Sequence, residues 1–367
     1  MRVKTADPLA LAIASALRRS WSWAEWGPAT RPPVDLHRWV ERLIDGGVGG
    51  LAWWRLRESD LAQAPELEPL QAAFRHHALT AARQERDLPH LLGHFNAEGI
   101  EPILFKGWTI ARLYPHRALR PFGDFDLLVR EAEAERARQV LRSLGPDLQA
   151  RADVDTPSTL ARYLPDRTEA ELYDRARPES IDSSRFRTLA PEDHLRLVAL
   201  HQLHHGGWRP LWLCDIAVLV EALPSGFSWE ACLAGDARLS EGVVASVALA
   251  HELLGAKLPD GTPRASIPGW LRKAVLHGWV HGYESMPPSL YELRKLGWAG
   301  ALKAIRARWP DPVSATVHLR APFRAVPRFA VQLVECSRRA ADFVRRDVRW
   351  RLGVDAKLAT VGKGVVP

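Results

Sequence analysis

Two aspartates separated by one residue, Asp124 and Asp126, are the side chains in this sequence best suited to chemistry. They alternate with the apolar residues Phe125, Leu127 and Val129. Because the side chains of a strand point alternately to its two faces, both carboxylates would project from one face and the apolar residues from the other. Two neighbouring carboxylates repel each other and resist burial. The pattern therefore favours a site for a divalent cation, which prefers oxygen ligands.

A basic turn precedes this pair in the chain. The apolar run Ile103–Phe105 ends in Lys106 and Gly107, and a helix-like segment follows. A strand-to-helix turn presents backbone N–H groups to anions, and glycine allows a close approach of the backbone. We therefore expect Lys106, Gly107 and Thr109 to bind phosphate groups, with Arg120 countering either the phosphates or the carboxylates.

Such residues suit nucleotidyl transfer from a nucleoside triphosphate (NTP). This reaction depends on charge neutralisation and on in-line alignment, which two Mg²⁺ ions about 4 Å apart can supply. Asp124 and Asp126 would hold these ions, and a third carboxylate on a neighbouring strand would complete the metal site. The candidate is Glu171, within the segment Glu169–Tyr173, which we interpret as a short strand. Asp124, Asp126 and Glu171 are then the expected catalytic residues, with Mg²⁺ or Mn²⁺ as cofactor and an NTP as co-substrate.

The surrounding sequence predicts an α+β protein that is mostly helical, in which a small mixed nucleotidyltransferase β-sheet lies between two helical lobes. Residues 8–98 and the chain from Pro191 onwards have the spacing of apolar residues typical of helices. Further strands are predicted at Ile103–Phe105, from Asp124 to Val129, and weakly at Leu148–Ala152. The expected limits are 1–98 for the N-terminal lobe, 99–185 for the catalytic core, 186–352 for the C-terminal lobe and 353–367 for a flexible tail.

Composition points to a cytoplasmic protein. The 367 residues are 47% hydrophobic and 25% charged, with no apolar run near the roughly 18 residues that cross a bilayer. The start of the chain lacks the features of a secretory signal, and the three cysteines form no CxxC pair. The formal net charge of +7 is concentrated in residues 301–367, which hold 14 Lys and Arg against 5 Asp and Glu. This region could contact an anionic partner, or its arginines could simply solvate amphipathic helices.

The combination of motifs resembles a known family. LFKGWTIARLYPHRALRPFGDFDLLVR is similar to the polymerase-beta-like nucleotidyltransferase superfamily, and more narrowly to a bacterial family described as uncharacterised nucleotidyltransferases. That family's pattern is an apolar strand, Lys-Gly, a helix ending in Leu-Tyr, then Arg and Asp-x-Asp-Leu-Leu-Val. A second block, HLRLVALHQLHHGGWRPLWLCDIAVLVEAL at residues 194–223, is similar to the family's helical segment with its Leu-x-Asp-Ile-Ala motif.

The resemblance implies that Asp124 and Asp126 are metal ligands and that Lys106 and Gly107 are the family's Lys-Gly. The family tends to have an acid-Leu-His strand between the two blocks. Here AELYDR has tyrosine in place of the histidine, so the third acid could be Glu171, Glu169 or Asp174.

Several alternatives stay open at this point. The nucleotidyl group would go to a hydroxyl, or to a phosphate, of an acceptor that could be a small molecule, a peptide or RNA. The motifs are also similar to toxin nucleotidyltransferases that act on RNA. A non-catalytic protein that binds a nucleotide or a partner with the same fold is a third reading. His201, His204 and His205 could bind a metal, line the substrate cleft or pack between helices. Asp215, in an apolar helix, needs a cationic partner, for which Arg209 and Arg120 are the candidates.

Overall fold

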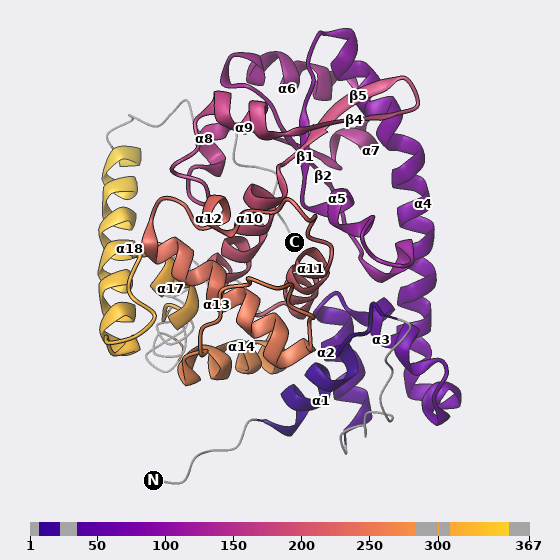
Figure 1. Ribbon diagram of the computed structural model, residues 1–367, viewed down its shortest axis with the longest axis vertical. Helices are drawn as coiled ribbons and strands as arrows, with labels where there is room; N and C mark the ends of the chain where they lie inside the picture. The colour runs from indigo at the N-terminus through magenta and orange to yellow at the C-terminus, as the bar shows by residue number, and fades with distance from the viewer. Residues whose placement is uncertain (1–6, 23–34, 283–299, 301–308, 352–367) are drawn as a thin grey trace. The chain divides into compact units, whose positions relative to one another are not determined.

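The computed structural model describes residues 7–22, 35–282, 300 and 309–351. It divides into two compact units, Met1–Tyr283 and Glu284–Pro367. The first unit is mostly helical and contains one small mixed sheet, which confirms the predicted fold class (Figure 1). The predicted limits of the lobes remain a prediction, and the tail expected at 353–367 lies outside the described residues.

The sheet has five strands in the order β3-β2-β1-β5-β4. The central strand β1 pairs antiparallel with β2 and parallel with β5, while β2 pairs parallel with β3 and β4 pairs antiparallel with β5. The strands are β1 (Ile103–Phe105), β2 (Phe125–Leu128), β3 (Ala152–Asp155), β4 (Arg177–Ile181) and β5 (Ser184–Thr188).

Helices precede, interrupt and follow the sheet. Those before it are α1 (Pro8–Leu17), α2 (Leu36–Asp45), α3 (Gly49–Leu56) and α4 (Glu68–Ala97). Between strands lie α5 (Gly107–Ala111), α6 (Ala134–Ser143), α7 (Pro146–Gln149), α8 (Pro157–Leu160) and α9 (Glu169–Arg175). After the sheet come α10 (Pro191–His204), α11 (Pro210–Glu221), α12 (Trp229–Cys232), α13 (Ala237–Leu254) and α14 (Gly269–His281).

Two strand predictions were wrong. Glu169–Tyr173 belongs to helix α9, because Thr168 and Glu171 form a capping box that starts a helix. The strand expected at Leu148–Ala152 begins only at Ala152, since Pro146 initiates the short helix α7. The sheet also gains the hairpin of β4 and β5, from a stretch that the sequence pattern did not assign to strands.

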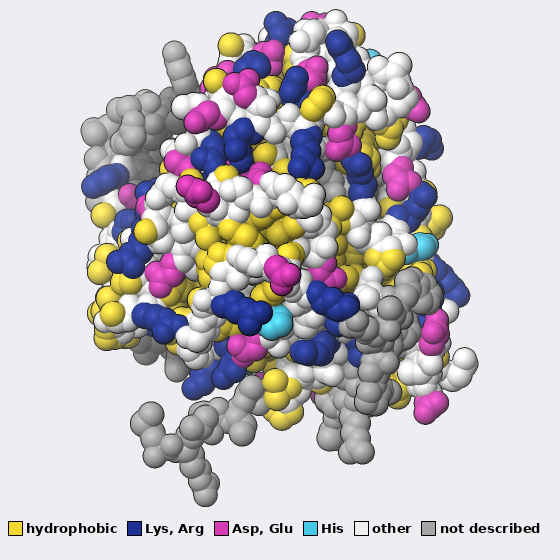
Figure 2. All heavy atoms as spheres, in the orientation of Figure 1, with side chains coloured by type: hydrophobic (Ala, Val, Ile, Leu, Met, Phe, Trp, Pro, Cys, Tyr) yellow, Lys and Arg dark blue, Asp and Glu magenta, His cyan; other side chains and the backbone are white. Residues whose placement is uncertain are grey.

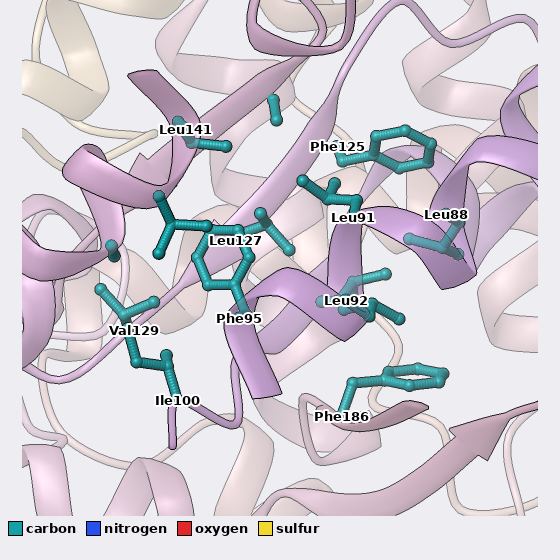
Figure 3. Close-up of a cluster of buried hydrophobic side chains, with 14 of the residues drawn as sticks. Leu88, Leu91, Leu92, Phe95, Ile100, Phe125, Leu127, Val129, Leu141 and Phe186 are labelled. Atoms are coloured by element: carbon teal, nitrogen blue, oxygen red, sulfur yellow. The ribbon is translucent and has the colours of Figure 1, made fainter. Parts of the chain in front are cut away.

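The long helix α4 holds the sheet in place. Its residues Leu88, Leu91, Leu92 and Phe95 are buried and pack in one cluster with Phe125, Leu127 and Val129 and with Phe186 of β5 (Figure 3). The apolar face of β2 therefore faces the core, as the alternation predicted. At its other end α4 contacts α2 and α3, so the same helix connects the sheet with the N-terminal helices (Figure 1).

The second unit contains α17 (Pro312–His318) and α18 (Arg328–Arg351). Within it, the fully buried carboxylate of Glu335 accepts hydrogen bonds from Arg338 and Arg339. Burial raises the pKa of Glu335, but these arginines outweigh that effect and lower it to about 2. Two of the basic side chains in this region are thus neutralised within the unit, and an anionic partner for the rest remains a prediction.

Charge on the visible face of the molecule is mixed. In Figure 2 the Lys and Arg side chains are interspersed with Asp and Glu side chains over the first unit. None of the described helices has the length and apolar character needed to cross a membrane.

Candidate active site

A cavity of about 480 Å³ lies where the sheet meets the helices. One face of α4 lines it, together with the β1–α5 turn, the loop that leads into β2, and α10 and α11. Five of the seven predicted site residues are among its lining residues: Lys106, Gly107, Arg120, Asp124 and Asp126. Most residues of the predicted site therefore line one cavity, which is large enough for a small-molecule substrate.

Asp124 and Asp126 flank the buried ring of Phe125 at the start of β2. Asp126 is largely buried, and its Oδ1 lies 3.3 Å from Nζ of Lys106. Burial raises the pKa of Asp126 to about 6; Lys106 lowers the value and Asp124 adds to the rise. The single ammonium group thus compensates only part of the negative charge in this corner.

The neighbouring strand supplies a third carboxylate that the sequence analysis missed. Asp126 of β2 is directly paired in register with Asp153 of β3. The pKa of Asp153 is raised by its partial burial and by the charges of Asp124 and Asp155. Asp153 therefore belongs to the same cluster of repelling carboxylates. Its signal in the sequence was the alternation Asp153-Val154-Asp155, the same pattern that revealed the first pair.

Glu171, by contrast, is not brought to the aspartates. It lies on α9, where its Oε2 accepts hydrogen bonds from the backbone N–H and the hydroxyl of Thr168 at 2.8 and 2.9 Å. The Thr168 contacts lower the pKa of its carboxyl. Neither Glu171 nor its alternatives Glu169 and Asp174 are among the described residues that line the cavity. The expectation that Glu171 faces Asp124 and Asp126 from an adjacent strand was wrong, because the segment is helical.

The turn after β1 has an unusual backbone conformation. Lys106 has a φ of 54°, in the left-handed region that non-glycine residues seldom adopt. Its N–H donates to Nε2 of the buried His194 on α10 at 3.1 Å. A Cβ atom on Gly107 would lie 3.1 Å from the carbonyl oxygen of Asp124, so the turn passes close to that residue. These contacts fix the Lys-Gly turn against the aspartate-bearing loop.

Thr109 is directed elsewhere. Its hydroxyl donates to the carbonyl oxygen of Lys106 at 2.6 Å, and Thr109 is not among the residues that line the cavity. In this arrangement its hydroxyl stabilises the turn. Contact of Thr109 with phosphate remains a prediction.

A family model described as "Uncharacterised nucleotidyltransferase" matches residues 32–255 of the chain. The chain belongs to this family. The match runs from the helices before the sheet to the end of α13 and includes every residue that lines the cavity. Searches of curated proteins and of solved structures found no match. The catalytic and binding residues must therefore be inferred from the geometry of this chain.

The buried aspartate of the second motif pairs with Arg120. Nε and Nη2 of Arg120 donate to the two oxygens of Asp215, at 3.2 and 2.9 Å, and the hydroxyl of Tyr114 donates to Oδ1 at 2.9 Å. Burial lowers the pKa of Arg120, but the charge of Asp215 outweighs it and raises the pKa. Of the two candidate partners, the structure selects Arg120 over Arg209. A phosphate-binding role of Arg120 stays a prediction, since its charge already has this counterion.

Of the three histidines, His201 lines the cavity. Burial, followed by the charge of Lys106, lowers its pKa to about 2, so His201 is neutral. Its ring lies 5.3 Å from that of Trp212 and 4.5 Å from that of His205, and the hydroxyl of Tyr163 lies 3.3 Å from Nδ1. These contacts agree with lining the cleft and with helix packing.

No group of three or more His, Cys, Asp or Glu side chains is arranged as a ready metal cage in the part of the chain that the structure describes. The donor chemistry of Asp124, Asp126 and Asp153 nevertheless fits a hard divalent cation. All three are carboxylates on adjacent strands or next to them, and the raised pKa values of Asp126 and Asp153 reflect burial and repulsion between carboxylates that Lys106 offsets only in part. Lys106 is the cation that now contacts Asp126.

Proposed function

We propose that this protein is a metal-dependent nucleotidyltransferase that transfers a nucleotidyl group from an NTP to a hydroxyl group of an acceptor, breaking the bond between the α- and β-phosphates and releasing pyrophosphate. The observation that carries the proposal is the register of β2 and β3. It sets Asp153 of β3 directly opposite Asp126, and Asp126 lines the cavity together with Asp124 and the Lys-Gly turn. Membership of the family supports nucleotidyl transfer as the general reaction.

Asp124, Asp126 and Asp153 would hold Mg²⁺ or Mn²⁺. When bound, such ions neutralise the triphosphate and lower the pKa of the acceptor hydroxyl. Lys106, already 3.3 Å from Asp126, is placed to contact the phosphate nearest the carboxylates. Gly107 keeps the backbone of the turn free of a side chain at the closest approach to Asp124. Asp153 is the most exposed of the three carboxylates, so an acceptor hydroxyl can reach it and transfer its proton to Oδ of this residue.

The helical side of the cavity would bind the rest of the substrates. His76, His77, Thr80 and Gln84 line it from α4, and His201, Arg209 and Trp212 line it from α10 and α11. Aromatic rings beside hydrogen-bonding groups suit a nucleobase or a polar organic acceptor. Which of these residues contact the base and which contact the acceptor depends on the orientation of the NTP.

The test is transfer of label to components of a cell lysate. The full chain is incubated with each α-labelled NTP and with Mg²⁺ or Mn²⁺, and the wild type is compared with the double variant Asp124→Asn/Asp126→Asn. We expect labelled acceptor with the wild type and none with the double variant. Label transfer that persists in the double variant would contradict the metal assignment. Absence of transfer with every NTP would favour a nucleotide-binding or partner-binding protein of the same fold.

A further inference from the structure

Arg209 is a second cation of the cavity, and it lies on the helical wall. It immediately precedes α11, which begins at Pro210, and it lines the same space as Asp124 and Asp126. The proposed transfer reaction assigns it no specific contact with a substrate. Its neighbours in the lining are His77 of α4 and Trp212 of α11.

The guanidinium group of Arg209 forms no ion pair within the described part of the chain. Among the described residues, no hydrogen bond or ion pair involves its guanidinium group, and its Nε is buried without a hydrogen-bond partner. Burial lowers the pKa of Arg209, the nearby charge of Arg120 lowers it further, and the charges of Asp215 and Asp124 offset only part of this fall. Arg120 itself differs, because Asp215 binds it through two hydrogen bonds. A partly buried, unpaired guanidinium is unfavourable, and an anion that entered the cavity would relieve this cost.

The guanidinium is held in place by what surrounds it. A Cβ atom on Gly47 would lie 2.7 Å from Nη2 of Arg209, so the side chain packs directly on the glycine backbone. Gly47 has a φ of 73°, which also favours glycine at this position. On the other side, the guanidinium carbon lies 5.9 Å from the centre of the Trp212 ring. Arg209 is therefore positioned before any ligand binds, which reduces the entropy lost on binding.

The position of Arg209 along the cavity follows from α4. His77 lies beside Arg209, whose charge contributes to the fall in the pKa of this histidine to about 4, although burial is the larger cause. Seven residues further along α4, Gln84 donates to the carbonyl oxygen of Phe122, in the loop that carries Asp124. At 1.5 Å per helical residue, the two ends of this wall are about 10 Å apart. Arg209 thus lies beside the His77 end of this wall, within electrostatic reach of Asp124.

We propose that Arg209 forms an anion subsite for a phosphate group, flanked by His77 and Trp212. The fork of guanidinium N–H groups binds phosphate oxygens in two parallel hydrogen bonds. His77 is neutral, so Arg209 is the cation that would pair with the phosphate here. Two substrates could supply this phosphate: the end of the NTP triphosphate, or a phosphorylated acceptor. Only this choice of source depends on the proposed function; the subsite itself does not.

The probe is inorganic phosphate, titrated calorimetrically into the metal-free full chain. Arg209→Gln should weaken phosphate binding by roughly tenfold or more, the loss expected for hydrogen bonds to a charged group. Arg209→Lys keeps the charge and should weaken it less. The matched control is Arg238→Gln, which removes an exposed arginine paired with Glu241 on α13 and should leave binding unchanged.

Equal phosphate affinity in the wild type, Arg209→Gln and Arg209→Lys would overturn the subsite. So would a loss of binding in Lys106→Met with full retention in Arg209→Gln, because phosphate would then bind at the Lys-Gly turn. Repeating the titration with each NTP at saturation in the presence of Ca²⁺ identifies the source. If a saturating NTP prevents phosphate from binding, Arg209 binds a phosphate of the NTP. If phosphate and NTP bind at the same time, Arg209 binds a phosphate of the acceptor. Failure of every NTP to bind would contradict the proposed transferase but not the phosphate site of Arg209.

Discussion

Replacing Asp215 by alanine should sharply destabilise the first unit. Arg120 is 7% exposed and Asp215 is 1% exposed, and Asp215→Ala would leave the guanidinium of Arg120 buried without its counterion. Two hydrogen bonds from Arg120 and one from Tyr114 would be lost at once. Breaking a buried pair in this way typically costs about 3 to 5 kcal/mol of the free energy of unfolding. Because both groups are buried, screening by solvent reduces this figure little.

The loss is large compared with the total stability of a domain, about 5 to 15 kcal/mol. For a unit of this size, about 4 kcal/mol corresponds to a fall in Tm of about 10 °C. The assay is urea denaturation of the full chain, followed by far-ultraviolet circular dichroism, for Asp215→Ala, Asp215→Leu, Arg120→Met and the variant Arg120→Met/Asp215→Leu. The double variant should be more stable than Asp215→Ala, since it leaves no unpaired buried charge and replaces the pair with apolar side chains.

Two results would refute this reasoning. One is an Asp215→Ala protein whose free energy of unfolding lies within about 1 kcal/mol of the wild type, below the range for a buried charge left unpaired. The other is a double variant whose loss equals the sum of the losses of Arg120→Met and Asp215→Leu, since the charges would then not interact.

Two further predictions concern the turn and the cap. His194 has a pKa lowered from 6.5 to about 4, mainly by burial and then by Arg120 and Lys106, and its neutral Nε2 accepts the N–H of Lys106. The unfolded chain therefore binds the proton more readily between these values, so the free energy of unfolding should fall by about 3 kcal/mol as pH drops from above 6.5 to below 4. His194→Leu should remove this part of the pH dependence in urea titrations; an unchanged pH profile would show that another group is responsible. For the cap of α9, Thr168→Ala should cost about 1 kcal/mol in the same assay, and no measurable loss would contradict the assignment of Glu171 and Thr168 as a capping box.

The sequence revealed the parts of the site that depend on local pattern. The alternation around Phe125 predicted which face of β2 carries Asp124 and Asp126, and the buried cluster on the opposite face confirms it. The resemblance of the two motif blocks to the family was also confirmed, by the match over residues 32–255. The alternation involves neighbouring residues, and each motif block is a continuous stretch of the chain.

What the sequence analysis missed depends on contacts between distant segments. Asp153 joins the site through the pairing of β3 with β2, and β3 is a four-residue edge strand with little apolar pattern. Asp215 pairs with Arg120 rather than with Arg209 because the tertiary structure brings these two distant residues together. Glu171 is a different case. The spacing of Thr168 and Glu171 is a local signal for a helix start, and it outweighed the similarity of AELYDR to a strand motif.

The identity of the third carboxylate tests the account most directly. Metal-stimulated label transfer should be measured for the wild type, Asp153→Asn and Glu171→Gln, with circular dichroism to establish that each variant is folded. We predict that Asp153→Asn lowers transfer by roughly a hundredfold or more, within the range for loss of a group that acts in proton transfer. Glu171→Gln, whose side chain caps α9 beside Thr168 and is not paired with β2, should retain nearly full activity. Full activity of Asp153→Asn together with loss of activity in Glu171→Gln would contradict the site described for this protein.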